Sequence, residues 1–224
     1  MIIDCHAHYE PRILDAESLV KKMNCAGVDK SVLIPLLTDP PETKKSDILI
    51  AIQRFMLNTE LLWPIAASIT KSMYKASGEW HIWYRKFSLG PQRFNIVEVP
   101  DNQSVAEVVS KYKGRLLGWI FINPSHDDSL EQIERWRNVQ GMIGVKIHPF
   151  WHRYPIEMVQ KVAQRIEELG LPMLVHLGFD SHGNYPWLID RFPKLKIIFA
   201  HLGVPFYKKM WPSVSNNPNV FMDI

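Results

Sequence analysis

Two histidines near the start of the chain are the first residues that could do chemistry. His6 and His8 are separated only by the small residue Ala7 and follow a short apolar run. On an extended strand, residues two apart point to the same side, so both imidazoles can bind one metal ion. An isolated H-x-H pair is as typical of ordinary surface histidines as it is of metal ligands. The pair therefore predicts a metal site only if further ligands converge on it.

Three more histidines each close an apolar, strand-like run. They are His148, His176 and His201. In parallel α/β folds, functional side chains gather at the carboxyl ends of the strands. A histidine that only packs would more often lie within a strand or on a helix face. Histidines at the ends of separate strands therefore predict one shared site, and neutral imidazoles favour a borderline metal such as zinc, with manganese, iron or cobalt as alternatives.

The elements that must position these histidines alternate between strands and helices. The strand-like runs are residues 2–5, 31–35, 116–122, 143–147, 172–176, 196–200 and 220–223. Amphipathic helices are expected over residues 15–26, 129–137 and 156–169. This order predicts an α/β fold of repeated βαβ units, either a closed barrel or an open doubly wound sheet. The sequence has no G-x-G-x-x-G or Walker A motif, which disfavours a nucleotide-binding version.

One interval is much longer than a single βαβ unit and predicts an insertion at about residues 58–100. A possible strand over residues 61–69 and an aromatic, basic stretch over residues 71–93 lie within it. That stretch carries a net charge of 5 − 1 = +4. It could pack its aromatic residues on the scaffold, form a lid or dimer contact, or bind single-stranded nucleic acid, in decreasing order of expectation.

Composition sets the remaining expectations. The chain is 46% hydrophobic and 22% charged, with a net charge of +3 and two cysteines, which is typical of a globular protein without a disulfide framework. No apolar run reaches the roughly 18 residues of a membrane span, and the start does not resemble a signal peptide. We expect a cytoplasmic protein that acts on a small molecule, with no nucleic-acid or membrane partner; a homodimer is compatible with the sequence.

Four motifs in order carry a family resemblance. They are Asp-Cys-His-Ala-His from Asp4, Gly-Val-Lys-Ile-His-Pro from Gly144, Leu-Val-His-Leu-Gly from Leu174 and Phe-Ala-His-Leu-Gly from Phe199. Together they resemble the amidohydrolase superfamily, in particular the amidohydrolase-2 type of metal-dependent TIM-barrel hydrolases, a group that also includes aromatic-acid decarboxylases. The resemblance implies a single TIM (β/α)8-type barrel over residues 1–224.

The resemblance also implies roles for these residues. His6, His8 and His176 match metal ligands, while His201 matches a histidine that binds a second metal or acts as an acid/base. Lys146 falls where some members carry a carboxylated lysine, and it could equally hold a substrate carboxylate or be structural. His148 shares a strand face with Lys146, so we expect both to act in catalysis with His201.

Loops after the strands are expected to bind the substrate through Trp151, Arg153 and Asp180. Arg153 suits a carboxylate, although a solvated loop arginine is as plausible. The family pattern also has a carboxylate after the eighth strand. The motifs make residues 219–223 the seventh strand, so we expect a barrel that lacks its C-terminal βα unit. Counting residues 61–69 as a barrel strand would instead place Asp223 after the eighth.

These residues predict a metal-dependent hydrolase in which a metal-activated water attacks a C–N or C–O bond of a small, carboxylate-bearing substrate. The same site is compatible with decarboxylation of an aromatic or vinylogous acid. A degenerate, non-catalytic barrel is the third reading, favoured by the absent eighth-strand aspartate and opposed by the retained histidines.

Overall fold

The structure, a computed structural model, describes residues 1–38, 55, 59, 62, 65, 80–82, 92–94, 96–178 and 180–223. The chain forms two compact units, which are treated separately. The barrel unit comprises Met1–Leu37 and Glu98–Ile224, and the inserted unit comprises Thr38–Val97.

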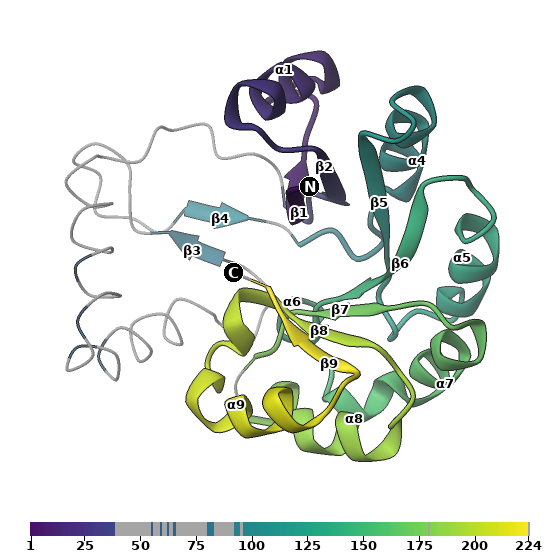
Figure 1. Cartoon of the computed structure of the whole chain (residues 1–224). Helices are drawn as coiled ribbons and strands as arrows, with labels where there is room; N and C mark the ends of the chain where they lie inside the picture. The colour runs from purple at the N-terminus through teal and green to yellow at the C-terminus, as the bar shows by residue number, and fades with distance from the viewer. Residues whose placement is uncertain are drawn as a thin grey trace. The chain divides into compact units, whose positions relative to one another are not determined.

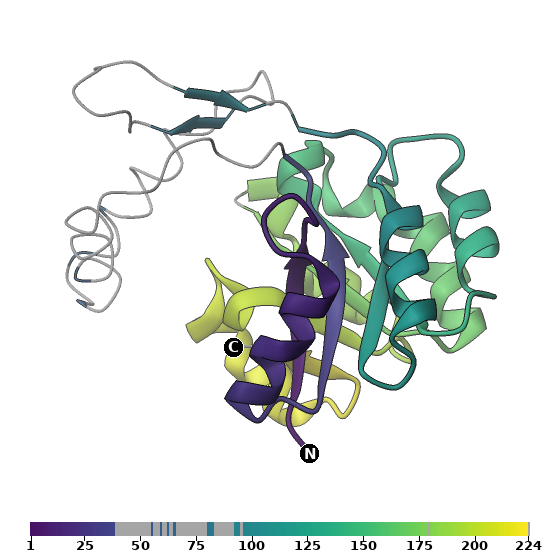
Figure 2. The same ribbon diagram turned by 90° about the horizontal axis from the view of Figure 1, so that it is seen from above.

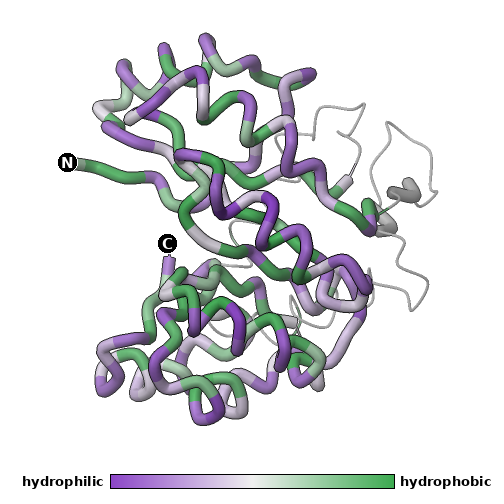
Figure 3. The backbone as a smooth tube through the Cα atoms, turned by 90° about the vertical axis from the view of Figure 1, so that its right-hand side faces the viewer, coloured by the Kyte–Doolittle hydropathy of each residue, from purple (hydrophilic) through white to green (hydrophobic). Residues whose placement is uncertain are grey.

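The barrel unit is built on one parallel sheet of seven strands. In spatial order they are β1 (Ile3–Tyr9), β2 (Lys30–Pro35), β5 (Leu116–Phe121), β6 (Met142–Ile147), β7 (Met173–Val175), β8 (Ile197–Phe199) and β9 (Val220–Met222). Every neighbouring pair is parallel, and the order follows the sequence. All seven predicted strands are therefore confirmed, and the sheet curls so that its first and last strands approach each other (Figures 2 and 3).

Helices cover the outside of this sheet (Figure 1). They are α1 (Ala16–Ala26), α4 (Asn102–Lys111), α5 (Ser129–Trp136), η2 (Ile156–Val159), α7 (Gln160–Leu169), α8 (Tyr185–Arg191) and α9 (Tyr207–Asn216). The short helices α6 (Pro149–His152), η3 (Asp180–Gly183) and η4 (Ala200–Gly203) instead follow β6, β7 and β8 at the carboxyl ends of these strands. No helix among the described residues is both long and apolar enough to cross a membrane.

The predicted helix boundaries have visible causes. Asp15 caps α1 by accepting a hydrogen bond from the backbone N–H of Ser18 at 2.9 Å, and Gly27 ends the helix with φ 70°. Gly170 ends α7 in the same way, with φ 66°. The left-handed conformation suits glycine because it has no Cβ.

Two apolar layers lie on opposite faces of the sheet. The larger one packs the sheet against its helices and includes Ile120, Val145 and Val175. The smaller one fills the concave side; its buried members are Val32, Ile34, Leu37, Trp119, Phe121, Leu174 and Ala200. Burial on both faces explains why the central strands β2, β5, β6 and β7 are apolar almost throughout.

The fold is a curled α/β barrel with seven described strands, one fewer than the eight of a complete TIM barrel. β9 takes the seventh position, as the motif register predicts. The alternative count depended on residues 61–69, which lie outside the described residues except for Leu62 and Ile65, and no described residue of that run joins the sheet.

One boundary prediction is wrong. His6 and His8 were expected directly after the first strand, but β1 runs through both to Tyr9. Its second half pairs with β2 through His8 opposite Ile34, and the register shifts by one residue between Asp4 and Ala7. Such a bulge inserts an extra residue and changes the direction in which the side chains point. The strand therefore continues past the apolar run that set the predicted boundary.

The inserted unit is described only in part. β3 (Trp80–Ile82) and β4 (Gln92–Phe94) form an antiparallel pair, and Thr38 forms an antiparallel bridge with Ile96. The rest of the predicted aromatic, basic stretch, residues 71–79 and 83–91, lies outside the described residues. The predicted insertion over residues 58–100 and its role stay predictions.

Candidate metal centre

Histidines from the ends of several strands meet at one end of the sheet. His6 and His8 come from β1, His148 follows β6, His176 follows β7 and His201 lies in η4 after β8. Their rings form a continuous series of contacts: the centroid separations are 5.4 Å for His6–His8, 4.6 Å for His6–His201, 4.9 Å for His176–His201 and 4.0 Å for His148–His176. The parallel sheet thus gathers all five imidazoles, as the sequence predicts.

Asp223 joins this group directly after β9. One of its carboxylate oxygens lies 2.6 Å from Nδ1 of His6, which donates the hydrogen bond when that nitrogen carries the proton. The other oxygen accepts the backbone N–H of His201. Burial alone would raise the pKa of Asp223, but the hydrogen bonds from His6 and His201 lower it below its ordinary value. The site therefore contains a buried carboxylate that links the first strand to the last two.

The turn that carries His201 has an unusual backbone. His201 and Leu202 have φ values of 53° and 58°, in the left-handed region that non-glycine residues rarely occupy. Asp223 holds this turn at two points, because its side chain accepts the N–H of His201 and its carbonyl oxygen accepts the N–H of Leu202 at 2.8 Å. Strained backbone of this kind persists when surrounding contacts determine it.

His148 and His176 are held by stacking. Their rings are 4.0 Å apart with an interplanar angle of 17°, and Trp151 stacks on His148 at 4.7 Å. The backbone N–H of Trp151 donates to Nδ1 of His148 at 3.2 Å, so that nitrogen acts as an acceptor. This hydrogen bond begins α6 and fixes the ring of His148.

The surrounding protein favours neutral imidazoles. Desolvation, followed by neighbouring positive charge, lowers the pKa values of His148 and His176 well below the ordinary 6.5. The same causes lower the pKa of His8 to about 3, although this residue keeps an exposed face. Desolvation also lowers the pKa of His201. Neutral imidazole is the form that can bind a metal ion, and burial keeps these side chains in that form.

Lys146 lies beneath the histidines on the concave side of β6. It is fully buried, at 0% exposure, and Nζ has no hydrogen-bond partner among the described residues. Desolvation lowers its pKa to about 7, while the negative charge of Asp223 opposes the shift. Burying a lysine without a partner is costly, so packing alone would not favour an amine at this position.

The donor atoms fit a metal ion. One ligand atom from each of His6, His201 and Asp223 lies within 4.8 Å of the other two. Nε2 of His6 is buried without a hydrogen-bond partner among the described residues, while Nδ1 is held by Asp223. A buried nitrogen left unpaired in this way is the arrangement expected of a ligand. His8 and His176 lie next to this set through the ring contacts given above.

The predicted substrate-binding residues are less tightly grouped. Trp151 stacks on His148, whereas Arg153 is an exposed residue at the C-terminus of α6, where it adopts φ 55°. Asp180 begins η3, and its side chain lies outside what the structure describes. Their binding roles stay predictions.

The close link between Asp223 and both His6 and His201 was not predicted from the sequence. A signal was present, because Val220–Asp223 is an apolar run ending in a chemically active side chain, like the runs that end in histidine. Its contact with His6 spans 217 residues and depends on the curl of the sheet.

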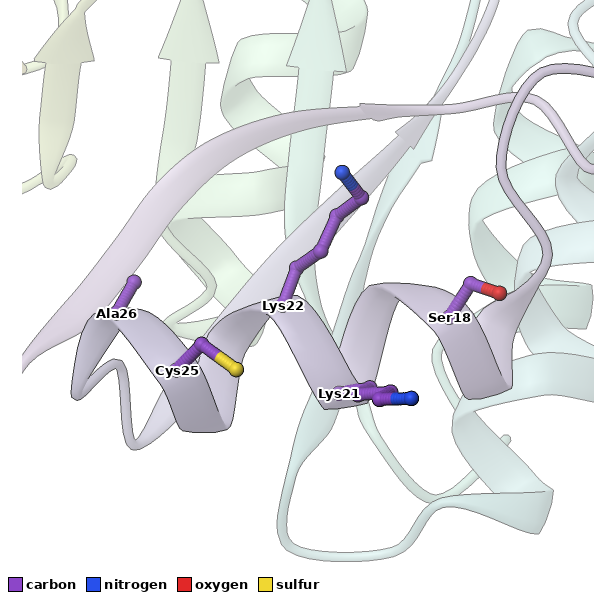
Figure 4. Close-up of a pocket in the computed structure, with 5 residues that line it drawn as sticks. All are labelled: Ser18, Lys21, Lys22, Cys25 and Ala26. Atoms are coloured by element: carbon purple, nitrogen blue, oxygen red, sulfur yellow. The ribbon is translucent and has the colours of Figure 1, made fainter.

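A surface hollow lies away from the histidines on the barrel unit. Figure 4 shows its lining residues, which all come from one face of α1: Ser18, Lys21, Lys22, Cys25 and Ala26. None of the histidines of the site lines it, so it is separate from the candidate metal centre.

The curled parallel sheet, with imidazoles gathered at the carboxyl ends of its strands, is typical of the TIM-barrel class of protein. The family described as Amidohydrolase (the Amidohydro_2 group) matches residues 3–224, and the chain belongs to that family. No curated protein sequence matches the chain significantly.

Solved structures with the same fold include different enzymes. A probable 2-pyrone-4,6-dicarboxylic acid hydrolase from Acinetobacter baumannii, with citric acid bound, is 13% identical with a TM-score of 0.55, over 99% of this chain and 68% of that one. An uncharacterised TIM-barrel protein from Bordetella bronchiseptica is 14% identical with a TM-score of 0.57, covering 99% and 74%. A 5-carboxyvanillate decarboxylase from Novosphingobium aromaticivorans, complexed with manganese and a nitrobenzoic acid, is 13% identical with a TM-score of 0.53, covering 96% and 69%. The fold therefore accommodates both hydrolases and decarboxylases.

Proposed function

We propose that this protein is a metal-dependent hydrolase that acts on a C–N or C–O bond of a small, carboxylate-bearing substrate. The observation that carries the proposal is the group of five imidazoles, one buried carboxylate and one buried amine at a single end of the sheet. Side chains that would be costly to bury for packing alone converge there from five strands.

His6, His8 and His176 would hold the ion. Nε2 of His6 is buried and without a described partner, and the lowered pKa values of His8 and His176 keep both imidazoles neutral at pH 7. Imidazole ligands favour zinc, while manganese, iron and cobalt are compatible with the same donors. A bound divalent ion would polarise a substrate carbonyl and lower the pKa of a water molecule.

The remaining groups would move protons and hold the substrate. His201 has a lowered pKa and is therefore neutral near pH 7, so its imidazole can accept a proton during the reaction. Lys146, with a pKa of about 7, can hold a substrate carboxylate or donate a proton when it is charged and can accept a proton when it is neutral. His148, kept neutral by burial and fixed by the N–H of Trp151, shapes the site beside Lys146. Arg153 and Asp180 would complete substrate binding from the loops.

Decarboxylation of an aromatic or vinylogous acid is the second candidate. The stacked arrangement of Trp151 and His148 offers a flat aromatic surface, which suits a planar aromatic acid. The buried Lys146 would then supply a proton to the carbon from which carbon dioxide leaves. Structures of similar fold include both reaction classes.

Metal analysis is the first test of the proposal. We expect purified protein, stripped with chelator and reloaded with zinc or manganese, to hold about one ion per chain, and the double variant His6→Ala/His8→Ala to fall below about 0.2. His126→Ala is the matched control, because His126 pairs with Glu98 away from the site. Wild-type protein that stays below about 0.2 would overturn the metalloenzyme proposal.

Activity assays then separate the two reaction classes. Loaded protein is offered lactone, ester and amide substrates that carry a carboxylate, and in parallel hydroxybenzoic acids with detection of carbon dioxide. Hydrolysis without carbon dioxide release supports the first proposal, while carbon dioxide release without hydrolysis replaces it with the second. Loaded protein inactive on both panels contradicts both and supports a non-catalytic barrel.

A further inference from the structure

We propose that Asp223 is a positioning residue, which fixes the tautomer of His6 so that Nε2 faces the metal ion, and that Asp223 does not itself bind the ion. This inference rests on the proposed metal site. It assigns a role to a residue at the end of the seventh strand and explains how an open sheet can hold its first-strand ligand in place.

The first argument is the contact between the two side chains. Nδ1 of His6 and a carboxylate oxygen of Asp223 are 2.6 Å apart, which is short for an N–H···O hydrogen bond and typical of a charged acceptor. The side chains are only 7% and 1% exposed. An ionised carboxylate accepts and cannot donate, so Nδ1 of His6 must carry the proton. Its other nitrogen, Nε2, then presents a lone pair.

The second argument is the state of that nitrogen. Nε2 of His6 is buried and has no hydrogen-bond partner among the described residues. A histidine that binds a metal usually gives its second ring N–H to a carboxylate or carbonyl, which fixes the tautomer and ring orientation. Nδ1 of His6 already contacts the carboxylate of Asp223, and Nε2 is the nitrogen that could bind an ion.

The third argument is that both oxygens of Asp223 already have donors. The oxygen that does not contact His6 accepts the backbone N–H of His201, and the carbonyl oxygen of Asp223 accepts the N–H of Leu202. This second contact lies at the left-handed turn that carries His201. Asp223 therefore sets the orientation of His6 and the position of His201 together, and the two rings stack at 4.6 Å.

Direct coordination by Asp223 is the competing reading. Its donor atoms lie within 4.8 Å of those of His6 and His201, so an ion bound among the three is geometrically conceivable. Coordination would, however, place the ion on an oxygen that already accepts a hydrogen bond, either from His6 or from the left-handed turn at His201. The two alternatives predict different results in two measurements. One is the tautomer of His6 in the metal-free protein, and the other is the set of ligands in the metal-loaded protein.

The first experiment uses the metal-free protein. Nitrogen-15 NMR of histidine side chains reports which ring nitrogen carries the proton. We expect His6 of the wild type to be held as the Nδ1–H tautomer, and Asp223→Ala to lose this single-tautomer signature. Asp223→Asn keeps one oxygen that can accept from His6 and should show an intermediate result. If His6 has the same tautomer in the wild type and Asp223→Ala, the positioning role is wrong.

The second experiment measures metal binding and the ligand set separately. Zinc affinity, from competition with a chromogenic chelator, is expected to fall about 10–100-fold in Asp223→Ala. At saturating cobalt, the visible absorption spectrum of Asp223→Ala should keep the wild-type band positions and intensities, because no ligand is lost. A changed cobalt spectrum in this variant would show that Asp223 is a ligand and would overturn the proposal.

Asp101→Ala is the matched control for loss of stability. Asp101 caps α4 by accepting the N–H of Ser104 at 3.2 Å and does not contact the histidines. We expect this variant to unfold at a lower temperature while its zinc affinity and His6 tautomer stay as in the wild type. Equal loss of affinity in Asp101→Ala would mean that Asp223 acts only through stability. A wild type that binds no metal would contradict the proposed function, whereas the tautomer measurement would still decide the role of Asp223.

Discussion

The candidate metal centre has two halves that are held by different forces. The carboxylate half consists of His6, His201 and Asp223 and depends on a charged hydrogen-bond acceptor. The stacked half consists of His148, Trp151 and His176 and depends on ring contacts and one backbone N–H. The first half joins strands from opposite edges of the sheet, and the second joins neighbouring strands in its middle.

This difference shows two ways of preparing an imidazole. In the carboxylate half, Asp223 determines which nitrogen of His6 carries the proton. In the stacked half, desolvation lowers the pKa values of His148 and His176 so far that both stay neutral without a carboxylate. In the carboxylate half the tautomer and orientation of an imidazole are fixed. In the stacked half the imidazoles are kept neutral and held in place by their neighbouring rings.

The largest effect is expected from the buried amine beside the stacked half. Lys146→Met removes a group whose pKa falls from 10.5 to about 7 on folding. Between these pH values the unfolded chain binds one proton more than the folded chain, so the wild-type free energy of unfolding should rise with pH by roughly 1 kcal/mol per unit. The variant should lose this rise.

Urea unfolding of metal-free protein between pH 7 and pH 10 measures this slope. Lys196→Met serves as the matched control, because Lys196 is exposed and its replacement should leave the slope as in the wild type. Equal slopes for wild type and Lys146→Met would mean that the amine is not desolvated. Desolvation would then not distinguish the surroundings of the stacked half from those of the carboxylate half.

A smaller effect is expected where the loops of the stacked half approach each other. A Cβ added at Gly178 would lie 2.5 Å from Cβ of Phe150, so Gly178→Ala must push the loops after β6 and β7 apart. We expect a loss of about 1–3 kcal/mol in the free energy of unfolding, together with changed resonances for His148 and His176. The His6 resonances should not change. A larger shift at His6 than at His176 would show that the two halves are not independent.

The smallest effect is expected from the ring at the outer side of the stacked half. Trp151→Ala removes the partially buried ring that stacks on His148 and should cost about 0.5–1.5 kcal/mol beyond the lost apolar area. Trp151→Phe keeps an aromatic face and should recover much of this loss. Thermal unfolding of both variants checks the order. A phenylalanine variant as unstable as the alanine variant would argue against stacking.

Much of the barrel follows from local sequence patterns. The apolar runs predict all seven strands, and for the central ones the reason is that a strand buried on both faces must be apolar along its length. The caps at Asp15, Gly27 and Gly170 act within one turn of the chain, so they can be recognised locally. The convergence of the histidines also follows, since parallel strands bring their carboxyl ends together.

The features that were not predicted depend on distant contacts. The bulge in β1 is set by its register against β2, and neither His6 nor its neighbours indicate it. The left-handed backbone at His201 and Leu202 opposes their local preference and is held by Asp223. Helix α4 was also not predicted, although Asp101 provides its cap. Its Asn102 exchanges two hydrogen bonds with the backbone of Phe121, which is again a tertiary contact.

The bond between His6 and Asp223 also bears on the order of folding, because its partners are 217 residues apart. Each hydrogen-bonded strand pair between β5 and β9 joins segments that are much closer in the sequence than His6 and Asp223. The His6–Asp223 bond must wait until the intervening strands have assembled and curled, since only then do its partners meet. During synthesis on the ribosome, the carboxylate half would therefore be the late product of folding, and partially folded chains would carry the stacked half alone.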